Sequence, residues 1–137
     1  MIEAIAFDAY GTLFDVYSVS VSCEEMFPNH GKAVSESWRD KQIEYTRLRT
    51  MCNQYKPFWE VTEDALIFTC KKLALNLTTE IKDTLMGQYA KLPAFCENVG
   101  VLRALKEKGI KLAILRCNLT FRMRTAFEFF TTNYKST

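Results

Sequence analysis

Residues 5–15 read Ile-Ala-Phe-Asp-Ala-Tyr-Gly-Thr-Leu-Phe-Asp, and this stretch decides the fold. The apolar start predicts a short buried strand over residues 2–7, and Gly11-Thr12 predicts a tight turn after it. Asp8 therefore comes at the carboxyl end of a strand, which is the edge where open α/β sheets bind their ligands. A carboxylate in that place is a candidate nucleophile.

A second apolar segment has the composition of a buried parallel strand. Residues 110–115 read Ile-Lys-Leu-Ala-Ile-Leu, and they follow Gly109, which predicts the end of a helix that begins at Asn98. Residues 116–137 have partly helical apolar spacing and indicate no further strand. Since sheets usually have about five or six strands, two strands indicate only part of a core domain.

The sequence between the two strands is helical in pattern. Apolar side chains recur at helical spacing in four segments, which are Ser18–Met26, Val34–Cys52, a helix capped by Thr62, and a helix that starts at Thr78 or Thr79. This block is too long for a simple crossover between parallel strands. We therefore predict an α/β protein with a partial Rossmann-like parallel-sheet core, residues 1–15 and 92–137, and an inserted helical cap, residues 16–91.

The composition and charge of the chain indicate which partners and which cell compartment to expect. The 137 residues are 48% hydrophobic and carry a net charge of +2, from 18 basic and 16 acidic side chains. Neither nucleic acid nor a membrane is expected as a partner of so balanced a chain. No apolar run approaches the ~20 residues of a membrane span, and the first residues show no secretory signal, so we expect a cytoplasmic protein.

The cysteines and the histidine form no reactive or metal-binding pattern. The five cysteines are widely spaced, odd in number and without a C-x-x-C pair, which predicts buried free thiols in a reducing compartment. His30 is the one histidine of the chain, and its turn-like surroundings predict an exposed loop position. This pattern supports neither a Cys-His nucleophile nor a zinc site.

Four segments resemble one protein family. Residues 7–16, Phe-Asp-Ala-Tyr-Gly-Thr-Leu-Phe-Asp-Val, resemble the first motif of the haloacid dehalogenase superfamily, and within it the L-2-haloacid dehalogenases. Residues 37–46, Ser-Trp-Arg-Asp-Lys-Gln-Ile-Glu-Tyr-Thr, are similar to the cap helix that carries that family's substrate-site arginine. Residues 62–66 and 111–115 also match, so the resemblance extends over nearly all of residues 1–115.

The resemblance implies hydrolytic dehalogenation of L-2-haloacids to 2-hydroxy acids. Asp8 would attack the halogen-bearing carbon and form an ester, which water then hydrolyses. Phosphatases of the superfamily need a second aspartate two residues after the nucleophile, as a general acid and a Mg²⁺ ligand. Here that position is Tyr10, and a phenol with an ordinary pKa of about 10 argues against phosphoryl transfer and against a metal. The implied substrate is a small halogenated carboxylic acid, and no cofactor is expected.

The resemblance also implies roles for other residues. Arg39 matches the arginine that receives the departing halide, and Thr12 matches the hydroxyl that orients the nucleophile. The backbone N–H groups of Ala9 and Tyr10 would help to hold the substrate carboxylate. Phe58 corresponds to an apolar wall of the substrate site. Because the family often dimerises through its cap helices, a homodimer is expected.

Each residue of the first motif has a structural alternative. Asp8 could be an ordinary strand-end turn residue. Thr12 could satisfy backbone groups of the turn, a role that is compatible with a catalytic one. Tyr10 and Phe58 could be packing aromatics, and for Phe58 this interpretation is nearly as strong as the functional one.

Two charged residues have alternatives of their own. Arg39 could be a solvated helix arginine paired with Asp40 or Glu36, and only the matched context favours the functional role. Asp15 resembles a second catalytic carboxylate, but we interpret it as a structural residue at the hinge of the cap.

The similarity ends after Leu115. The family continues with a Ser-Asn-Gly motif whose serine binds the substrate carboxylate, whereas this chain has Arg116, Cys117 and Asn118. An arginine could pair with a carboxylate, fill the site, or compete for Asp8.

Two later elements of the family have no counterpart in the chain. They are the lysine after the third core strand and an acidic segment that positions the hydrolytic water. We therefore expect a truncation or a frameshift at about residue 115. The alternative function is an inactive truncated remnant that acts at most as an interaction module. A metal-dependent phosphatase is a third hypothesis, which Tyr10 disfavours.

Overall fold

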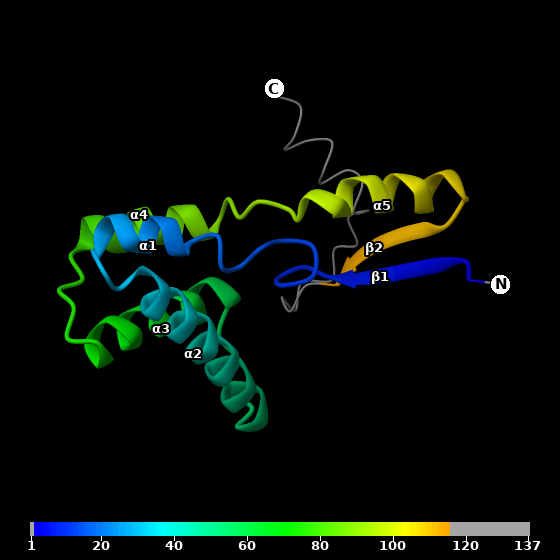
Figure 1. The fold of residues 1–137 in the computed structure, drawn as a ribbon. Helices are drawn as coiled ribbons and strands as arrows, with labels where there is room; N and C mark the ends of the chain where they lie inside the picture. Colours follow the sequence, from blue (N-terminus) through cyan, green and yellow to red (C-terminus); the bar gives the residue numbers. More distant parts are fainter. Residues whose placement is uncertain (1, 116–137) are drawn as a thin grey trace. The chain divides into compact units, whose positions relative to one another are not determined.

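A computed structural model describes residues 2–115 of the chain (Figure 1). Its elements in chain order are β1 (Ala4–Asp8), α1 (Ser20–Met26), α2 (Gly31–Met51), α3 (Phe58–Lys72), α4 (Thr79–Tyr89), α5 (Cys96–Glu107) and β2 (Lys111–Leu115). The described residues divide into two compact units. One holds the chain up to Asp15 and from Pro93 onward, and the other holds the inserted stretch Val16–Leu92. This organisation confirms the predicted α/β fold class, while a capping role for the inserted unit stays a prediction.

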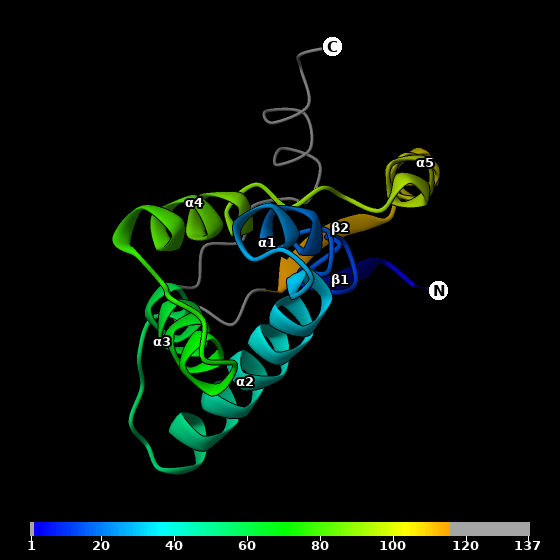
Figure 2. The same ribbon diagram turned by 60° about the vertical axis from the view of Figure 1, so that its left-hand side comes forward.

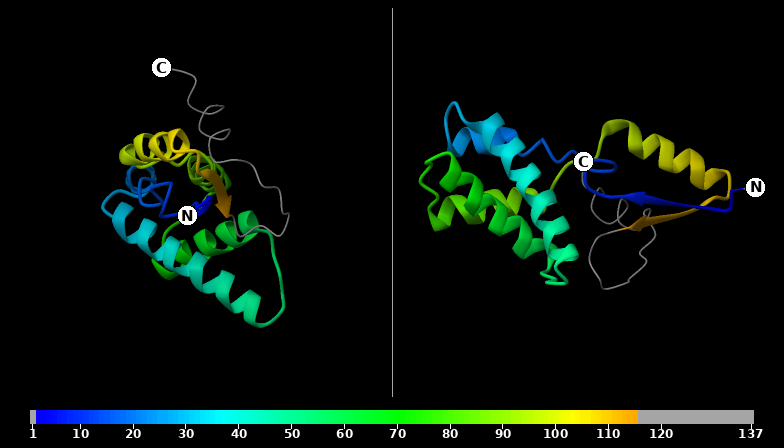
Figure 3. Two further views of the ribbon diagram at one scale, coloured as in Figure 1. Left: turned by 90° about the vertical axis from the view of Figure 1, so that its right-hand side faces the viewer. Right: turned by 90° about the horizontal axis from the view of Figure 1, so that it is seen from below.

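The first unit contains a parallel pair of strands and one helix. β1 and β2 are paired in parallel, with Ala4 opposite Lys111 and Asp8 opposite Leu115. α5 precedes β2 and contacts it, and the right-hand view of Figure 3 shows α5 running alongside the strands. The helix ends as the sequence predicts, because Gly109 has a φ of +76°, a conformation that glycine adopts without strain.

The prediction that the first strand is buried is wrong for the described structure. Ala4, Ala6 and Asp8 are exposed, and Ile5 and Phe7 are only half-buried. Successive side chains of a strand point to opposite faces, so one face of β1 is partly covered and the other is open. Parallel strands are ordinarily covered by helices on both faces, and the described residues place α5 against β2.

The second unit is a bundle of four helices. α2 contacts both α1 and α3, and α4 contacts α1 and α3; Figure 2 shows α2 and α3 side by side. The side chains that meet in its core are almost completely buried, and the largest of them are Trp38, Leu66, Leu85, Gln42, Val34, Thr62 and Thr69. Their spacing of three or four residues on each helix explains why the apolar periodicity predicted these elements.

The start of α3 differs from the prediction. Thr62 does not cap this helix, because α3 begins four residues earlier, at Phe58, directly after Pro57. Proline needs no N–H partner at a helix start, so it suits that position. Thr62 lies inside the helix with 0% exposure, and its hydroxyl donates to the Phe58 carbonyl oxygen at 2.8 Å.

The observed starts of α4 and α5 can be compared with the predicted ones. Thr78 caps α4 as predicted, because its Oγ1 accepts a hydrogen bond from the Ile81 N–H at 3.3 Å. α5 begins at Cys96, two residues before the predicted Asn98. The Asn98 side chain bonds elsewhere, as described below, so it does not act as a helix cap.

The cysteines are divided between core and surface. Cys23 and Cys70 are buried, as predicted, and burial raises the pKa of the Cys23 thiol to about 12 and of the Cys70 thiol to about 11. Cys52 and Cys96 are exposed, so the prediction is wrong for them: one follows the end of α2 and the other begins α5. Cys117 and the predicted helical pattern of residues 116–137 lie outside the described residues.

Candidate active site

The turn after β1 carries most of the predicted site residues. Asp8 is the last residue of β1 and is exposed. The Ala9 carbonyl oxygen accepts from the N–H groups of Leu13, at 3.0 Å, and Phe14, at 2.9 Å. The Gly11 N–H donates to the Phe14 carbonyl oxygen at 2.9 Å, and Gly11 has a φ of +96°. The turn is therefore closed by backbone bonds and needs glycine at its tip.

Thr12 and Asn98 hold this turn from two sides. The Thr12 hydroxyl lies 3.5 Å from Asp8 Oδ2, at the long limit of a hydrogen bond. The Asn98 Nδ2 group donates to the carbonyl oxygens of Thr12, at 2.9 Å, and Leu13, at 3.0 Å. The backbone of the turn is thus tied to α5, although the two segments are far apart in sequence. Sequence reasoning missed this role of Asn98 because nothing local to it signals a distant partner.

Tyr10 and Asp15 occupy the two ends of the same loop. The Tyr10 ring lies 6.5 Å from the Phe14 ring, centroid to centroid, with the planes tilted by 45°. Asp15 is the last residue before the inserted unit, and its N–H donates to the Pro93 carbonyl oxygen at 2.9 Å. That bond joins the segment that leaves the first unit to the segment that returns to it, which suits the hinge role predicted for Asp15.

Arg39 lies on α2 of the helical unit and is half-buried. Its Nη1 group donates to Gln42 Oε1 at 2.7 Å. The alternative partner Glu36 instead forms an exposed ion pair with Lys32, at 3.8 Å. Arg39 is therefore bonded to a neutral acceptor on the same helix, three residues further on.

Gln42 is the centre of a buried polar network. It is 1% exposed, and its Nε2 group donates to Thr62 Oγ1 at 2.6 Å. Its Oε1 also accepts from the Tyr89 hydroxyl at 3.0 Å. Trp38 Nε1 donates to the Thr62 carbonyl oxygen at 2.8 Å, and the Trp38 and Tyr89 rings lie 4.9 Å apart. Three helices, α2, α3 and α4, contribute to this network.

Phe58 is connected to the same network through its backbone. It is the first residue of α3 and is half-buried, and its carbonyl oxygen accepts from the Thr62 hydroxyl. Sequence reasoning missed Gln42 and Thr62 as members of this network. The available signal was their position: Gln42 follows Trp38 by four residues, so a polar side chain occupies an apolar face.

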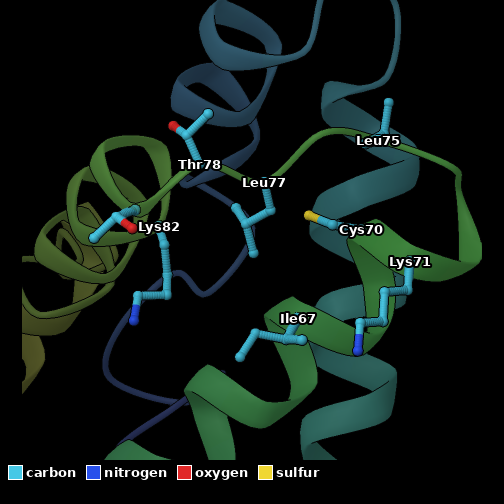
Figure 4. Close-up of a pocket in the computed structure, with 8 residues that line it drawn as sticks. Ile67, Cys70, Lys71, Leu75, Leu77, Thr78 and Lys82 are labelled. Carbon is cyan, nitrogen blue, oxygen red and sulfur yellow. The ribbon is translucent and has the colours of Figure 1, made fainter.

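A pocket of about 300 Å³ lies between α3 and α4 (Figure 4). Its lining residues are Ile67, Cys70, Lys71, Leu75, Leu77, Thr78, Thr79 and Lys82. None of them is a predicted site residue. Lys82 is already paired with Glu63 at 2.6 Å, and this bond raises the pKa of the lysine. The pocket therefore adds nothing to the predicted site.

The described residues show neither a metal-binding cluster nor a membrane span. No group of three or more His, Cys, Asp and Glu side chains among residues 2–115 could hold a metal ion. Within the same residues, no helix combines the length and the apolar character needed to cross a bilayer. The first unit therefore holds the predicted carboxylate on a turn that backbone bonds close, and the helical unit holds the predicted arginine, which is bonded to an amide oxygen. Arg116, the residue that replaces the family's serine, lies outside the described part.

Comparison with known proteins identifies close relatives. The (S)-2-haloacid dehalogenase of Pseudomonas sp. strain YL is 52% identical over 114 residues, which are 83% of this chain and 49% of that protein. Haloacetate dehalogenase H-2 of Moraxella sp. strain B is 47% identical over 83% of this chain and 51% of its own length. No protein-family model matches the chain.

Solved structures give the same result. The structure of an L-2-haloacid dehalogenase superposes with a TM-score of 0.81 at 54% identity, over 83% of this chain and 52% of that one. The L-2-haloacid dehalogenase of Xanthobacter autotrophicus, with chloropropionic acid covalently bound, gives a TM-score of 0.77 at 37% identity, over 84% and 46%. The chain thus spans about half the length of the relatives it matches.

Proposed function

Because its sequence is related to the L-2-haloacid dehalogenases over 83% of its residues, we propose that the chain carries the nucleophile of such an enzyme. In the proposed reaction an Asp8 carboxylate oxygen attacks C2 of an L-2-haloacid. The carbon–halogen bond breaks, halide leaves with the bonding electrons, and an ester forms. Water then attacks the ester carbonyl, which releases the 2-hydroxy acid, a proton and the free carboxylate.

The observation that carries this proposal is the presentation of Asp8. The side chain is exposed at the carboxyl end of a parallel strand, on a turn that backbone bonds and Asn98 hold in place. A nucleophile that is already held in one geometry loses less conformational entropy when it reaches the reacting carbon. The covalent chloropropionic acid in a related structure supports a covalent step in this family.

The other predicted roles belong to the same proposal. Arg39 would receive the departing halide, since a cation stabilises negative charge that develops on the leaving atom. Thr12 would orient Asp8, and the N–H groups of Ala9 and Tyr10 would bind the substrate carboxylate. Phe58 would form an apolar wall. The reaction needs no metal and no cofactor, because halide leaves without protonation.

We also propose a cytoplasmic homodimer that forms through the helical unit. The surface of the helical unit carries exposed large apolar side chains around the end of α2 and the start of α3. They are Leu48, Met51, Tyr55 and Trp59. Met51 alone is 82% exposed. Exposed apolar side chains that gather into one large patch mark interaction sites, and the proposal is that these four residues do so. Sedimentation of the purified chain checks this point, and a monomer at all concentrations would contradict it.

The second candidate function is a non-catalytic interaction module. The observation that favours it is the exposure of Ala4, Ala6 and Asp8 on one face of β1. The open face of β1 gives such a module a surface for a partner.

One assay separates the two functions. The purified chain is incubated with L-2-chloropropionate, and free chloride is measured, with Asp8→Asn as the control. The enzyme predicts chloride release that the substitution abolishes. Release that survives in Asp8→Asn refutes Asp8 as the nucleophile, and no release from the unmodified chain favours the interaction module.

A further inference from the structure

We propose that Asn98 is a positioning residue for Asp8: its side-chain amide holds the backbone at Thr12, the residue whose hydroxyl faces the Asp8 carboxylate. This inference rests on the proposed function, in which Asp8 is the nucleophile. It goes beyond that function by naming a residue outside the first motif that controls how the nucleophile is presented. All the contacts that carry it lie within the first unit.

The orientation of the Asn98 amide follows from the chemistry of its partners. Carbonyl oxygens only accept hydrogen bonds, so the atom that faces the Thr12 and Leu13 oxygens, at 2.9 Å and 3.0 Å, must be the amide nitrogen. This nitrogen has two protons, and there is one carbonyl oxygen for each. An ionised carboxylate of the same shape has only acceptors, so it would bring an oxygen against both carbonyls and repel them.

The two carbonyls belong to peptide groups that also hold the start of the turn. A peptide group is planar, so the Thr12 oxygen moves with the Leu13 N–H, and the Leu13 oxygen moves with the Phe14 N–H. Both N–H groups donate to the Ala9 oxygen, at 3.0 Å and 2.9 Å. Each peptide group is therefore held at both ends, by Asn98 on one side and by the residue after the nucleophile on the other.

Of the two peptide groups, the one that begins at Thr12 depends more on Asn98. The Leu13 oxygen has a second donor, the Phe95 N–H at 3.2 Å, which a change of side chain at residue 98 leaves in place. Within residues 2–115, the donor to the Thr12 oxygen is the Asn98 amide. Thr12 also carries the hydroxyl that lies 3.5 Å from Asp8 Oδ2. Loss of the amide should therefore act on Thr12 first, and on Asp8 through it.

Asn98 itself lies on a rigid element. It is in the first turn of α5, where its own N–H donates to the Phe95 oxygen at 3.1 Å. α5 contacts β2, and β2 pairs with β1, which ends at Asp8. The turn is therefore held by the strand at one end and by the helix at the other, and sites that are built on such elements keep a more exact geometry than sites on loops alone.

The test compares three variants of the full chain with the unmodified chain. Asn98→Leu keeps the approximate size of the side chain and removes both donors. Asn98→Asp keeps the shape and replaces the donor with an acceptor. Asn76→Asp is the matched control, because it makes the same substitution at an exposed asparagine of the helical unit. Two quantities are measured for each chain: hydrogen exchange of the Leu13 and Phe14 amides by NMR, and formation of the Asp8 ester with L-2-chloropropionate by rapid acid quench.

The time course of ester formation separates position from stability. Its amplitude counts the folded, competent chains, whereas its rate constant reports how well each of them attacks the substrate. A purely structural role of Asn98 would lower the amplitude alone. The positioning role predicts a rate constant about tenfold lower in Asn98→Leu, the size of one hydrogen bond, and at least as low in Asn98→Asp. Exchange of the Leu13 and Phe14 amides should become about tenfold faster in both variants, and Asn76→Asp should change neither quantity.

Two results overturn the proposal. They are a rate constant of ester formation in Asn98→Leu equal to that of the unmodified chain, and exchange of the Leu13 and Phe14 amides that neither variant accelerates. Asn98→Asp decides the question if Asn98→Leu does not fold, since it keeps the shape of the native side chain. The proposed function fails separately, when the unmodified chain forms no ester. A chain that forms no ester but shows the expected exchange overturns dehalogenation and leaves the hold of Asn98 on the turn in place.

Discussion

Replacing Gly31 with alanine should destabilise the helical unit through a backbone collision. Gly31 is the first residue of α2, and a Cβ built on it would lie 2.6 Å from Glu24 Cβ and 2.7 Å from the Glu24 backbone nitrogen on α1. Real Cβ atoms do not approach so closely, and a backbone atom cannot rotate away. α1 and α2 must therefore separate for the variant to fold.

The magnitude follows from two contributions. Overpacking of this kind costs about 1–3 kcal/mol. The separation also weakens the bond from the Gly31 N–H to Glu24 Oε2, now 2.7 Å long, by about 1 kcal/mol. The gain from alanine over glycine offsets less than about 1 kcal/mol. We therefore expect a net loss of about 1–3 kcal/mol, which corresponds to a fall in Tm of roughly 4–12 °C.

The assay is thermal and urea unfolding followed by far-ultraviolet circular dichroism. Gly87→Ala is the matched control, because it makes the same substitution inside α4, where the new Cβ meets no atom within 4 Å apart from the adjacent backbone of its own helix. That variant should be more stable than the unmodified chain by about 0.5–1 kcal/mol. Equal or greater stability of Gly31→Ala would refute the reasoning.

Two further predictions concern Glu24 and the four described cysteines. The backbone N–H groups of Asn29 and Gly31 hold the pKa of the Glu24 carboxyl below its ordinary value of 4.5, so Glu24→Gln should lower stability at neutral pH. The difference in the free energy of unfolding between Glu24→Gln and the unmodified chain should shrink as pH falls below about 4.5, because the native carboxyl then takes up a proton. Urea titrations from pH 7 to pH 3 measure this difference, and a constant value would contradict the prediction. Among the four described cysteines, iodoacetamide should label Cys52 and Cys96 and spare Cys23 and Cys70 in the folded chain, because the last two are buried with raised thiol pKa values. Peptide mapping after labelling reads this out, and equal labelling of all four would show that the core opens.

Local patterns were enough to predict the order of elements. The apolar run before Asp8, the run after Gly109 and the helical spacing between them depend on side chains within a few residues of one another. Thr62 was misassigned for the opposite reason. Its hydroxyl donates to the Phe58 carbonyl oxygen one turn earlier on the same helix and accepts from Gln42 across the core, and this second contact cannot be predicted from local sequence.

The site was predicted in part. Asp8 and Thr12 belong to one contiguous motif, so the sequence places them on the same turn. Asn98, which holds that turn, is 86 positions from Thr12, and its role depends on tertiary contact. Gln42 was visible only as a polar residue on an apolar helix face. The prediction that β1 is buried was wrong because an apolar strand composition is typical of strands inside a larger sheet. The described part of the chain contains two strands.

The most direct test of the central claim is the mass of the peptide that contains Asp8 after a rapid acid quench with L-2-chloropropionate. Nucleophilic attack by Asp8 predicts an adduct on this peptide equal in mass to the substrate anion without its chloride, formed together with free chloride and absent from Asp8→Asn. Chloride release without an adduct on Asp8, or an adduct on another residue, would contradict the claim.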